Sequence, residues 1–307
     1  RRMIRMADEL RNKCYRGDEE TDDILAEAQQ SIIEISQDRS SRGLVHIGRY
    51  LNEGLEKLEK LSEKSDTVTG IPTGFIDLDR RTSGLHAAEL IILAARPAMG
   101  KTSLALNIAQ NVAVKAKKNV AVFSLEMPGV QVANRMLSCE ARLSSENIKR
   151  GEIKDDEWGQ IGNAVSVLSQ ANIYVDDTSS ITVSEIGARC RKLMLEKGLD
   201  VVVIDYLQLI RGSGRGANRQ QEITEISRNL KILANDLNIP IIALSQLSRA
   251  SDKEKREPVL SDLRDSGAIE QDADMVMFLH REGYYHEDAE EPNKAKCSFA
   301  KHRNGEV

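Results

Sequence analysis

The sequence has few aromatic residues, no paired cysteines and no long apolar run. Aromatic residues make up 4% of the 307 positions, with a single Trp. The four cysteines are scattered and form no C-x-x-C pair, so we expect no cysteine-bound metal and reduced thiols, as in a cytoplasmic protein. No apolar run approaches the roughly 20 residues that a membrane-spanning helix needs, so no such helix is predicted.

An excess of positive charge is also missing. The chain carries 43 Lys and Arg against 48 Asp and Glu, which gives a formal net charge of −5. Such a balance creates no global basic field to attract nucleic acid, although single loops can still bind phosphate groups. The hydrophobic fraction of 40% is typical of a globular protein, and the length allows one large domain or two modest ones.

The first 70 residues carry apolar residues at helical spacing. Residues 1–37 predict a helical hairpin, and residues 38–70 predict a linker that contains an amphipathic helix at Leu44–Lys64. The apolar stripe of that helix needs a partner surface, which is either its own core or a neighbouring subunit. The chain begins without an initiator Met, and we expect it to be part of a longer protein.

From residue 71 onward, apolar strands alternate with helices. This alternation is typical of an α/β domain with a parallel sheet, and continuous apolar strands indicate burial on both faces. The predicted strands are Leu90–Ala95, Val120–Leu125, Ile173–Val175, Val201–Asp205, Ile241–Ser245, Met275–Leu279 and Ala295–Ala300. The predicted helices lie near 103–116, 128–141, 155–169, 182–198 and 219–237.

The stretch Leu90–Ser103, LIILAARPAMGKTS, joins an apolar strand to a helix and predicts a phosphate-binding loop. Backbone N–H groups at a helix N-terminus have no partner within the helix and point at an anion. Gly100 lets the backbone approach phosphate, Lys101 reaches the β and γ oxygens, and the Thr102 hydroxyl can bind Mg²⁺. Ala95 departs from the common motif, which has its first Gly at that position.

Two further apolar strands end in carboxylates. Asp205 closes VVVID and is expected beside the phosphate loop, where it would hold Mg²⁺ through water. Glu126 is expected at the tip of the strand next to that loop, where it would orient the water that attacks a phosphoryl group. The alternatives are a helix-capping Asp and an ordinary strand-end Glu.

Three polar residues near strand ends are candidates for sensing or stabilising phosphate. Gln246 ends an apolar strand, where a neutral amide can sense the γ-phosphate; the alternative is a surface Gln. Lys301 and Arg303 lie two residues apart, on one face if the segment is a strand. Two such cations can stabilise a transferring phosphoryl group, either in their own chain or in a neighbour of a ring. The alternative is a solvated basic tail.

Two loops are candidates for binding an extended anion. Arg211–Arg219 reads RGSGRGANR, and Leu260–Asp274 reads LSDLRDSGAIEQDAD, with Arg264 and Gly267 in a polar turn. Backbone N–H groups near Gly, together with an Arg, can bind phosphate without reading bases. The near absence of aromatic residues argues against base stacking; the alternative for either segment is a mobile surface loop.

Several stretches, taken in order, resemble the DnaB family of bacterial replicative DNA helicases, whose motor is a RecA-like P-loop ATPase. The resemblance covers almost the whole chain, and the order of the stretches makes it specific. In that family A-R-P-x-M-G-K-T is a normal form of the phosphate loop, which accounts for Ala95. The stretches are PTGFIDLDRRTSGL, AARPAMGKTSLALNIA, FSLEM, VIDYLQLI, NRQQEITEISRNLK, ALSQLSR, LRDSGAIEQDAD and KHRNG.

The resemblance implies a RecA-like fold with a central mostly parallel sheet, preceded by a helical hairpin and a linker helix. It implies a cytoplasmic homohexameric ring that encircles single-stranded DNA, hydrolyses ATP with Mg²⁺ and moves 5′ to 3′ to unwind duplex DNA at the replication fork. Residues 1–37 become the end of an N-terminal helical collar, the helix at 44–64 docks on a neighbouring subunit, and residues 71–307 form an ATPase domain that is incomplete at its C-terminus. A helicase loader and primase are expected partners of the full-length protein.

The resemblance also implies roles for single residues. Glu126 becomes the catalytic carboxylate, with Lys101 in the same site, and Lys301 and Arg303 become fingers that reach the adjacent subunit's ATP. The implied metal site is Thr102 with Asp205. The implied ATP-binding residues are Ala98, Gly100, Lys101, Thr102, Ser103, Arg135 and Gln246. The implied DNA contacts are Arg264, Asp265 and Gly267, in preference to the loop at 211–219.

Two other classes of protein share parts of this pattern. A RecA-like recombinase or a circadian-type ATPase has the same motor without the helical collar. The amphipathic helix ahead of Pro72 favours the helicase. A small-molecule kinase would use the same loop but would have a substrate lid and would lack the Lys301–Arg303 pair.

Overall fold

The computed structural model describes residues 11, 46–62, 68–212, 218–248, 256–263, 267–285, 290–291 and 293–305. The chain divides into two compact units, Arg1–Asp66 and Thr67–Val307, which are described separately. Apart from Arg11, the predicted hairpin at 1–37 lies outside the described residues. Within the described ranges, no helix combines the length and apolar character that crossing a membrane requires.

In the first unit, α3 (Ile47–Ser62) confirms the predicted amphipathic helix. Its apolar stripe includes Ile47, Leu51 and Leu55, which recur every four residues and so share one face. Each of these side chains is more than half exposed. The stripe therefore offers an uncovered apolar surface.

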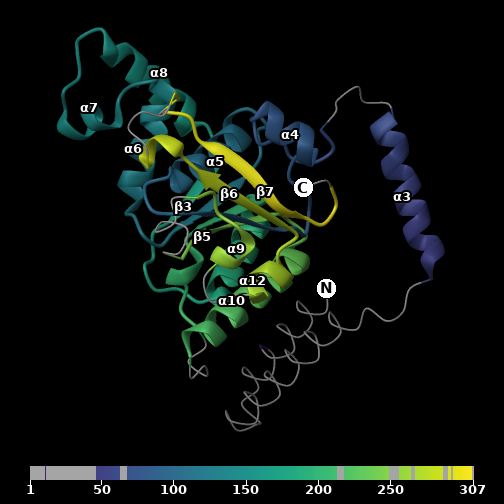
Figure 1. Cartoon of the computed structure of the whole chain (residues 1–307). Helices are drawn as coiled ribbons and strands as arrows, with labels where there is room; N and C mark the ends of the chain where they lie inside the picture. The colour runs from purple at the N-terminus through teal and green to yellow at the C-terminus, as the bar shows by residue number, and fades with distance from the viewer. Residues whose placement is uncertain are drawn as a thin grey trace. The chain divides into compact units, whose positions relative to one another are not determined.

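The second unit is built on a seven-stranded sheet with helices on both faces (Figure 1). All seven predicted strands are confirmed, and the fold class is the predicted mixed α/β class. Six strands are parallel, and the edge strand β7 runs antiparallel to β6. The strands are β1 (Leu90–Ala95), β2 (Val120–Ser124), β3 (Ile173–Asp176), β4 (Val201–Asp205), β5 (Ile241–Gln246), β6 (Met275–His280) and β7 (Lys296–His302).

The central strand β1 explains why the predicted strands read as continuous apolar runs. All six of its residues are buried, and successive side chains enter opposite faces of the sheet. Leu90 and Ile92 pack in a core with residues of α9 (Val183–Glu196) and α10 (Arg219–Leu237). Ile91 packs in the other core with α5 (Lys101–Val114) and α6 (Gly129–Ala141). Two cores, one on each face, thus hold the central strand.

The helices follow the predicted periodicity, with three short additions. The predicted helix near 103–116 begins two residues earlier, at Lys101, so its first turn includes the Lys and Thr of the phosphate loop. The further helix predicted near 155–169 is α8 (Glu157–Ser169). Sequence periodicity missed the short helices α4 (Ile76–Thr82), α7 (Ser145–Arg150) and α12 (Gly267–Asp272), because six or seven residues are too few to display a helical repeat.

The strand order corrects one expectation. The order is β3-β2-β4-β5-β1-β6-β7, so β4 and β5 lie between β2 and β1. The expectation that Glu126 follows the strand next to the phosphate loop is therefore wrong. Strand pairing is a long-range choice that apolar runs do not encode. Because parallel strands end at the same edge, the tips of β1, β4 and β2 still face one region.

The segment before β1 is tied down by one buried carboxylate. Asp79, on α4, accepts hydrogen bonds at Oδ1 from Thr73 N (2.8 Å) and Thr73 Oγ1 (2.7 Å), and at Oδ2 from Gly74 N (3.1 Å). The carbonyl of Thr73 in turn accepts from Asn111 Nδ2 on α5 at 3.1 Å. Asp79 thereby fastens the entry of the domain to the helix that follows the phosphate loop.

We predict that Asp79→Ala lowers the free energy of unfolding by about 2–4 kcal/mol, because it leaves two backbone donors and one hydroxyl without their acceptor. Urea unfolding of the full-length protein measures this change from the shift of the midpoint. Asp77→Ala on the same helix is the matched control. Its side chain is 93% exposed, so we expect almost no change, and equal shifts for the two variants would contradict this account.

Candidate functional site

The phosphate loop bends into α5 at Gly100. Gly100 caps the N-terminus of the helix with φ +92° and ψ +15°, a left-handed conformation that favours glycine. A Cβ at Gly100 would meet its nearest neighbour, Leu279, at 3.8 Å, so the requirement for Gly is conformational rather than steric. The turn brings the amides of the first helical residues, which have no acceptor within the helix, to face the space beyond β1.

Lys101 lies between an aromatic ring and two carboxylates. Its Nζ is 4.8 Å from the centre of the Tyr206 ring, a cation–π distance. Burial lowers the pKa of Lys101, while the negative charges of Asp205 and Glu126 raise it. The same surroundings raise the pKa of Tyr206, first through burial and then through the two carboxylates. A cation is therefore held in a partly desolvated site, where it interacts strongly with an anion.

Thr102 and Asp205 meet across the end of β5. Thr102 Oγ1 donates a hydrogen bond to Asp205 Oδ2 at 2.7 Å. Asp205 is 3% exposed, and its second oxygen, Oδ1, is buried with no hydrogen-bond partner among the described residues. Buried carboxylate oxygens are normally paired, so an unpaired one beside a hydroxyl is a site for a donor or a cation.

Glu126 is placed by the turn that follows β2. Ser124 Oγ donates to the carbonyl of Met127 at 2.7 Å, and Leu125 N donates to the carbonyl of Asp205 at 2.8 Å. These two bonds hold the turn against the end of β4. The Glu126 side chain is exposed, as a carboxylate that must meet solvent or substrate should be.

The end of β5 is held by a neighbouring amide. Gln208 Nε2 donates to Ser245 Oγ at 2.9 Å and to the carbonyl of Gln246 at 3.3 Å, while Gln246 N donates to Gln208 Oε1 at 3.3 Å. Gln208 lies in the short 3₁₀ turn Leu207–Leu209, directly after the Asp205 strand. The backbone of Gln246 is thereby fixed beside the phosphate loop.

These residues surround one cavity of about 400 Å³. It contains every residue that the sequence predicted to bind ATP, together with Glu126. Asp205 is joined to it through Thr102. The lining is Arg96, Pro97, Ala98, Gly100, Lys101, Thr102, Ser103, Glu126, Met127, Arg135, Tyr206 and Gln246.

Sequence reasoning did not single out Arg96, Pro97, Met127 and Tyr206 as lining residues. Each is adjacent in sequence to a predicted site residue or lies within the phosphate loop itself. The signal that would have found them is therefore position at a strand end, since loops at the carboxyl edge of a parallel sheet form its binding crevice.

A chain of hydrogen bonds leads away from the phosphate loop. Arg96 Nη1 donates to the carbonyl of Leu247 at 2.8 Å, and Ser248 N donates to the carbonyl of Asp262 at 2.8 Å. The Asp262 carboxylate is gripped by both terminal nitrogens of Arg256, at 2.6 and 3.0 Å. The start of the phosphate loop is thus connected to the segment that precedes the predicted DNA contacts.

Of the predicted DNA contacts, Gly267 is the first residue of α12, and Arg264 and Asp265 lie outside the described residues. The alternative loop at 211–219 is described only at its ends. There, Arg219 donates to the carbonyl of Gln208 and pairs with Glu222 at 2.6 Å. The structure therefore does not bring the two sets of candidates together.

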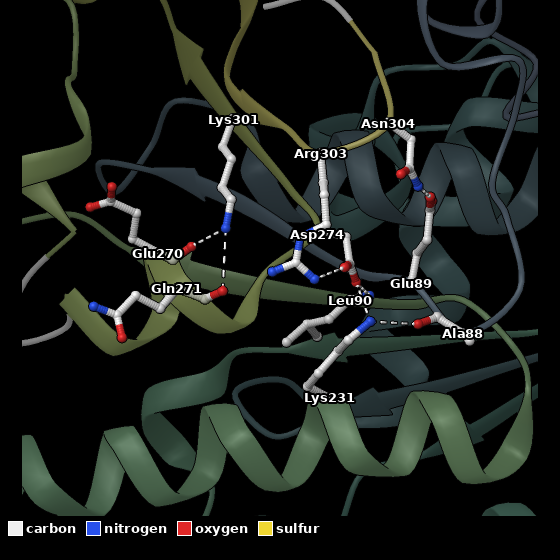
Figure 2. Close-up of polar contacts among 10 residues, drawn as sticks. All are labelled: Ala88, Glu89, Leu90, Lys231, Glu270, Gln271, Asp274, Lys301, Arg303 and Asn304. Atoms are coloured by element: carbon white, nitrogen blue, oxygen red, sulfur yellow. Dashed lines mark hydrogen bonds and ion pairs between the residues drawn. The ribbon is translucent and has the colours of Figure 1, made fainter. Parts of the chain in front are cut away.

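Lys301 and Arg303 do not line the cavity of their own chain. Figure 2 shows both reaching from the β7 segment towards α12 and the start of β6. Lys301 Nζ donates to the carbonyls of Glu270 and Gln271 at 2.6 and 3.3 Å, and Arg303 Nη1 donates to Asp274 Oδ1 at 3.0 Å. Both cations are thus engaged by their own chain, away from its phosphate loop.

Comparison with known proteins places this site in a family. A family model for the DnaB-like helicase C terminal domain matches residues 70–307. Replicative DNA helicase DnaB of Geobacillus stearothermophilus is 50% identical over 309 residues, covering 100% of this chain and 68% of that protein. Replicative DNA helicase DnaC of Bacillus subtilis (strain 168) is 47% identical over 309 residues, with the same coverage.

Two solved structures share the fold. One is an isolated ATPase domain, which aligns with a TM-score of 0.80 and 36% identity, covering 86% of this chain and 94% of that one. The other is a DnaB-like replicative helicase, described with its interactions with primase, which aligns with a TM-score of 0.78 and 33% identity, covering 99% of this chain and 72% of that one. The phosphate loop, the strand-end carboxylates and the sheet therefore belong together: the chain is a member of the DnaB-like family of replicative DNA helicases, which are ATP-dependent enzymes.

Proposed function

We propose that the cavity binds ATP with Mg²⁺ and hydrolyses it to drive translocation on single-stranded DNA. The observation that carries the proposal is the convergence of Lys101, the Thr102–Asp205 pair and Glu126 on one cavity at the carboxyl edge of the sheet. A cation, a metal-binding pair and a free carboxylate are the three elements that phosphoryl transfer to water requires.

The phosphates are bound by the loop and by Lys101. Amides at the start of α5 donate to phosphate oxygens, and the partial positive charge of the helix N-terminus adds to their effect. The Lys101 ammonium sits beside two carboxylates in a partly buried site, so a triphosphate would provide it with a stronger anionic partner. Gln246, fixed by Gln208, is positioned to contact the terminal phosphate.

Thr102 and Asp205 fit Mg²⁺. Their oxygens are the hard ligands that this ion prefers, and the unpaired Oδ1 of Asp205 offers an acceptor for a metal-bound water. Bound there, the metal would neutralise charge on the β and γ phosphates. Glu126, exposed at the cavity wall, would orient and polarise the attacking water as a general base.

We further propose that catalysis is completed between subunits of a homohexameric ring that moves 5′ to 3′. Lys301 and Arg303 lie away from their own cavity, so their predicted role requires a neighbour's nucleotide. The uncovered apolar face of α3 would dock on an adjacent subunit, and Arg264, Asp265 and Gly267 would bind DNA phosphates. A helicase loader and primase would act on the full-length protein in the cytoplasm.

We predict that Glu126→Gln lowers kcat for ATP hydrolysis by about 100- to 10,000-fold while the affinity for ATP stays within about threefold, because the amide can fill the site but cannot act as a base. Unwinding of a forked duplex with a 5′ single-stranded tail should be lost with it. Glu152→Gln, which changes an exposed Glu outside the cavity, is the control. Normal turnover in Glu126→Gln would remove Glu126 from the mechanism.

We predict that rings mixed from Glu126→Gln and Arg303→Ala subunits regain part of the ATPase activity that each variant lacks. In such rings, some interfaces pair the intact cavity of an Arg303→Ala subunit with the intact arginine of a Glu126→Gln subunit. Co-expression with two different affinity tags and sequential purification isolates mixed rings of the full-length protein. If Arg303→Ala is fully active alone and no mixture gains activity, the arginine does not act in a neighbour.

A further inference from the structure

Asp274, which immediately precedes β6, is a buried carboxylate on which three segments converge (Figure 2). It is 5% exposed. Its Oδ2 accepts from Leu90 N at 2.9 Å and from Lys231 Nζ at 2.6 Å, and its Oδ1 accepts from Arg303 Nη1 at 3.0 Å. The backbone N of Arg303 also donates to the carbonyl of Asp274 at 2.9 Å. One residue therefore joins β1, α10 and the end of β7.

The two oxygens of Asp274 have different partners. Oδ2 is satisfied by the fold, because Lys231 is itself fixed through a second bond to the carbonyl of Ala88 at 2.9 Å. Oδ1 accepts from Arg303, whose side chain is 52% exposed and is bound to Asp274 through one nitrogen. Lys231 therefore provides the buried charge with a permanent counter-ion, and Arg303 is held in direction without being buried.

Asp274 also makes the pair of cations tolerable. Arg303 and Lys301 repel each other, and the positive charge of Arg303 adds to burial in lowering the pKa of Lys301. The carboxylates of Asp274, Glu270 and Asp272 raise that pKa in compensation. Lys301 is separately bound to the last carbonyls of α12, where helix carbonyls lack partners within the helix. The two cations thus have separate anchors, and the anchor of Arg303 is Asp274.

We propose that Asp274 is a positioning residue for the active site of the neighbouring subunit, acting through Arg303. The inference rests on the proposed function, in which Arg303 serves a neighbour's ATP. The guanidinium donates one N–H to Oδ1, which restricts a long and flexible side chain, and its remaining N–H groups stay available for phosphoryl oxygens. Positioning of this kind raises the rate of the chemical step more than it raises affinity for ATP.

The test uses Asp274→Asn in the full-length protein. Asn keeps an oxygen for Leu90 N but removes the charge that holds Arg303. We expect kcat for ATP hydrolysis to fall about tenfold with KM for ATP within about twofold, since each cavity is intact and only the incoming arginine is misplaced. Glu270→Gln, which removes a carboxylate beside the same cations but leaves the Arg303 bond, is the matched control and should stay near wild-type activity. Wild-type kcat for Asp274→Asn overturns the inference.

Mixed rings separate positioning in the neighbour from simple support of the fold. Rings of Asp274→Asn and Glu126→Gln subunits should recover activity as rings of Arg303→Ala and Glu126→Gln subunits do, because Glu126→Gln subunits supply an intact Asp274–Arg303 pair. Recovery with Arg303→Ala but not with Asp274→Asn overturns this inference alone. Recovery with neither overturns the proposed exchange of residues between subunits.

A double variant gives a second, independent readout. If Asp274 acts through Arg303, Asp274→Asn should lower kcat no further when Arg303→Ala is already present, whereas a structural defect would multiply with it. Asp274→Glu covers the case in which Asp274→Asn fails to fold, because it keeps a carboxylate for Lys231 and shifts the acceptor of Arg303 by one methylene. It should give the same recovery in mixed rings, and a defect that mixing with Glu126→Gln does not relieve would contradict the proposal.

Discussion

The hydrogen bond from Thr102 to Asp205 is the contact on which the geometry of the site depends. The two residues belong to α5 and β4, and β5 lies between β4 and the strand that leads into α5. The bond forms only if β1 and β4 end at the same level, and the pairing of Ala95 with Gln246 sets that level on the β1 side. A shift of one strand by one residue would turn its side chains to the other face and would separate the metal-binding pair. The two apolar cores that clamp β1 thus also determine where Lys101 and Glu126 lie.

The sheet separates two kinds of chemistry. The nucleotide cavity lies at the tips of its central strands, whereas Lys301 and Arg303 lie along its β7 edge, bound to α12 and Asp274. α12 begins at Gly267, directly after the predicted DNA contacts. A single short helix therefore lies between the segment expected to bind DNA and the cations expected to serve a neighbouring ATP. On the other side, Arg96 and Asp262 connect the same DNA segment to the chain's own phosphate loop. These contacts give a replicative helicase two short physical routes by which DNA and nucleotide can affect each other.

Much of the fold was predictable because its signals are local. Val201–Asp205 and Leu90–Ala95 are continuous apolar runs bounded by polar loops, and both became strands with unchanged bounds. The binding residues of the cavity were predictable for a related reason, since the carboxyl ends of parallel strands share one edge. Strand order was not predictable, because pairing between β1 and β5 joins residues about 150 positions apart with no local marker. Asp274 escaped notice for the same reason: in the sequence it is one acidic residue among several, and only the fold brings Leu90, Lys231 and Arg303 to it.

The most direct test of the account is the Mg²⁺ dependence of nucleotide affinity, measured by calorimetry with ADP on the full-length protein and on Asp205→Asn. The account predicts that Mg²⁺ strengthens binding to the wild-type protein by at least about tenfold, equivalent to roughly 1.4 kcal/mol, and that Asp205→Asn loses most of this gain while still binding metal-free ADP through the phosphate loop. An equal gain from Mg²⁺ in both proteins would contradict the assignment of the metal to the Thr102–Asp205 pair, and with it the arrangement of the site that the pair defines.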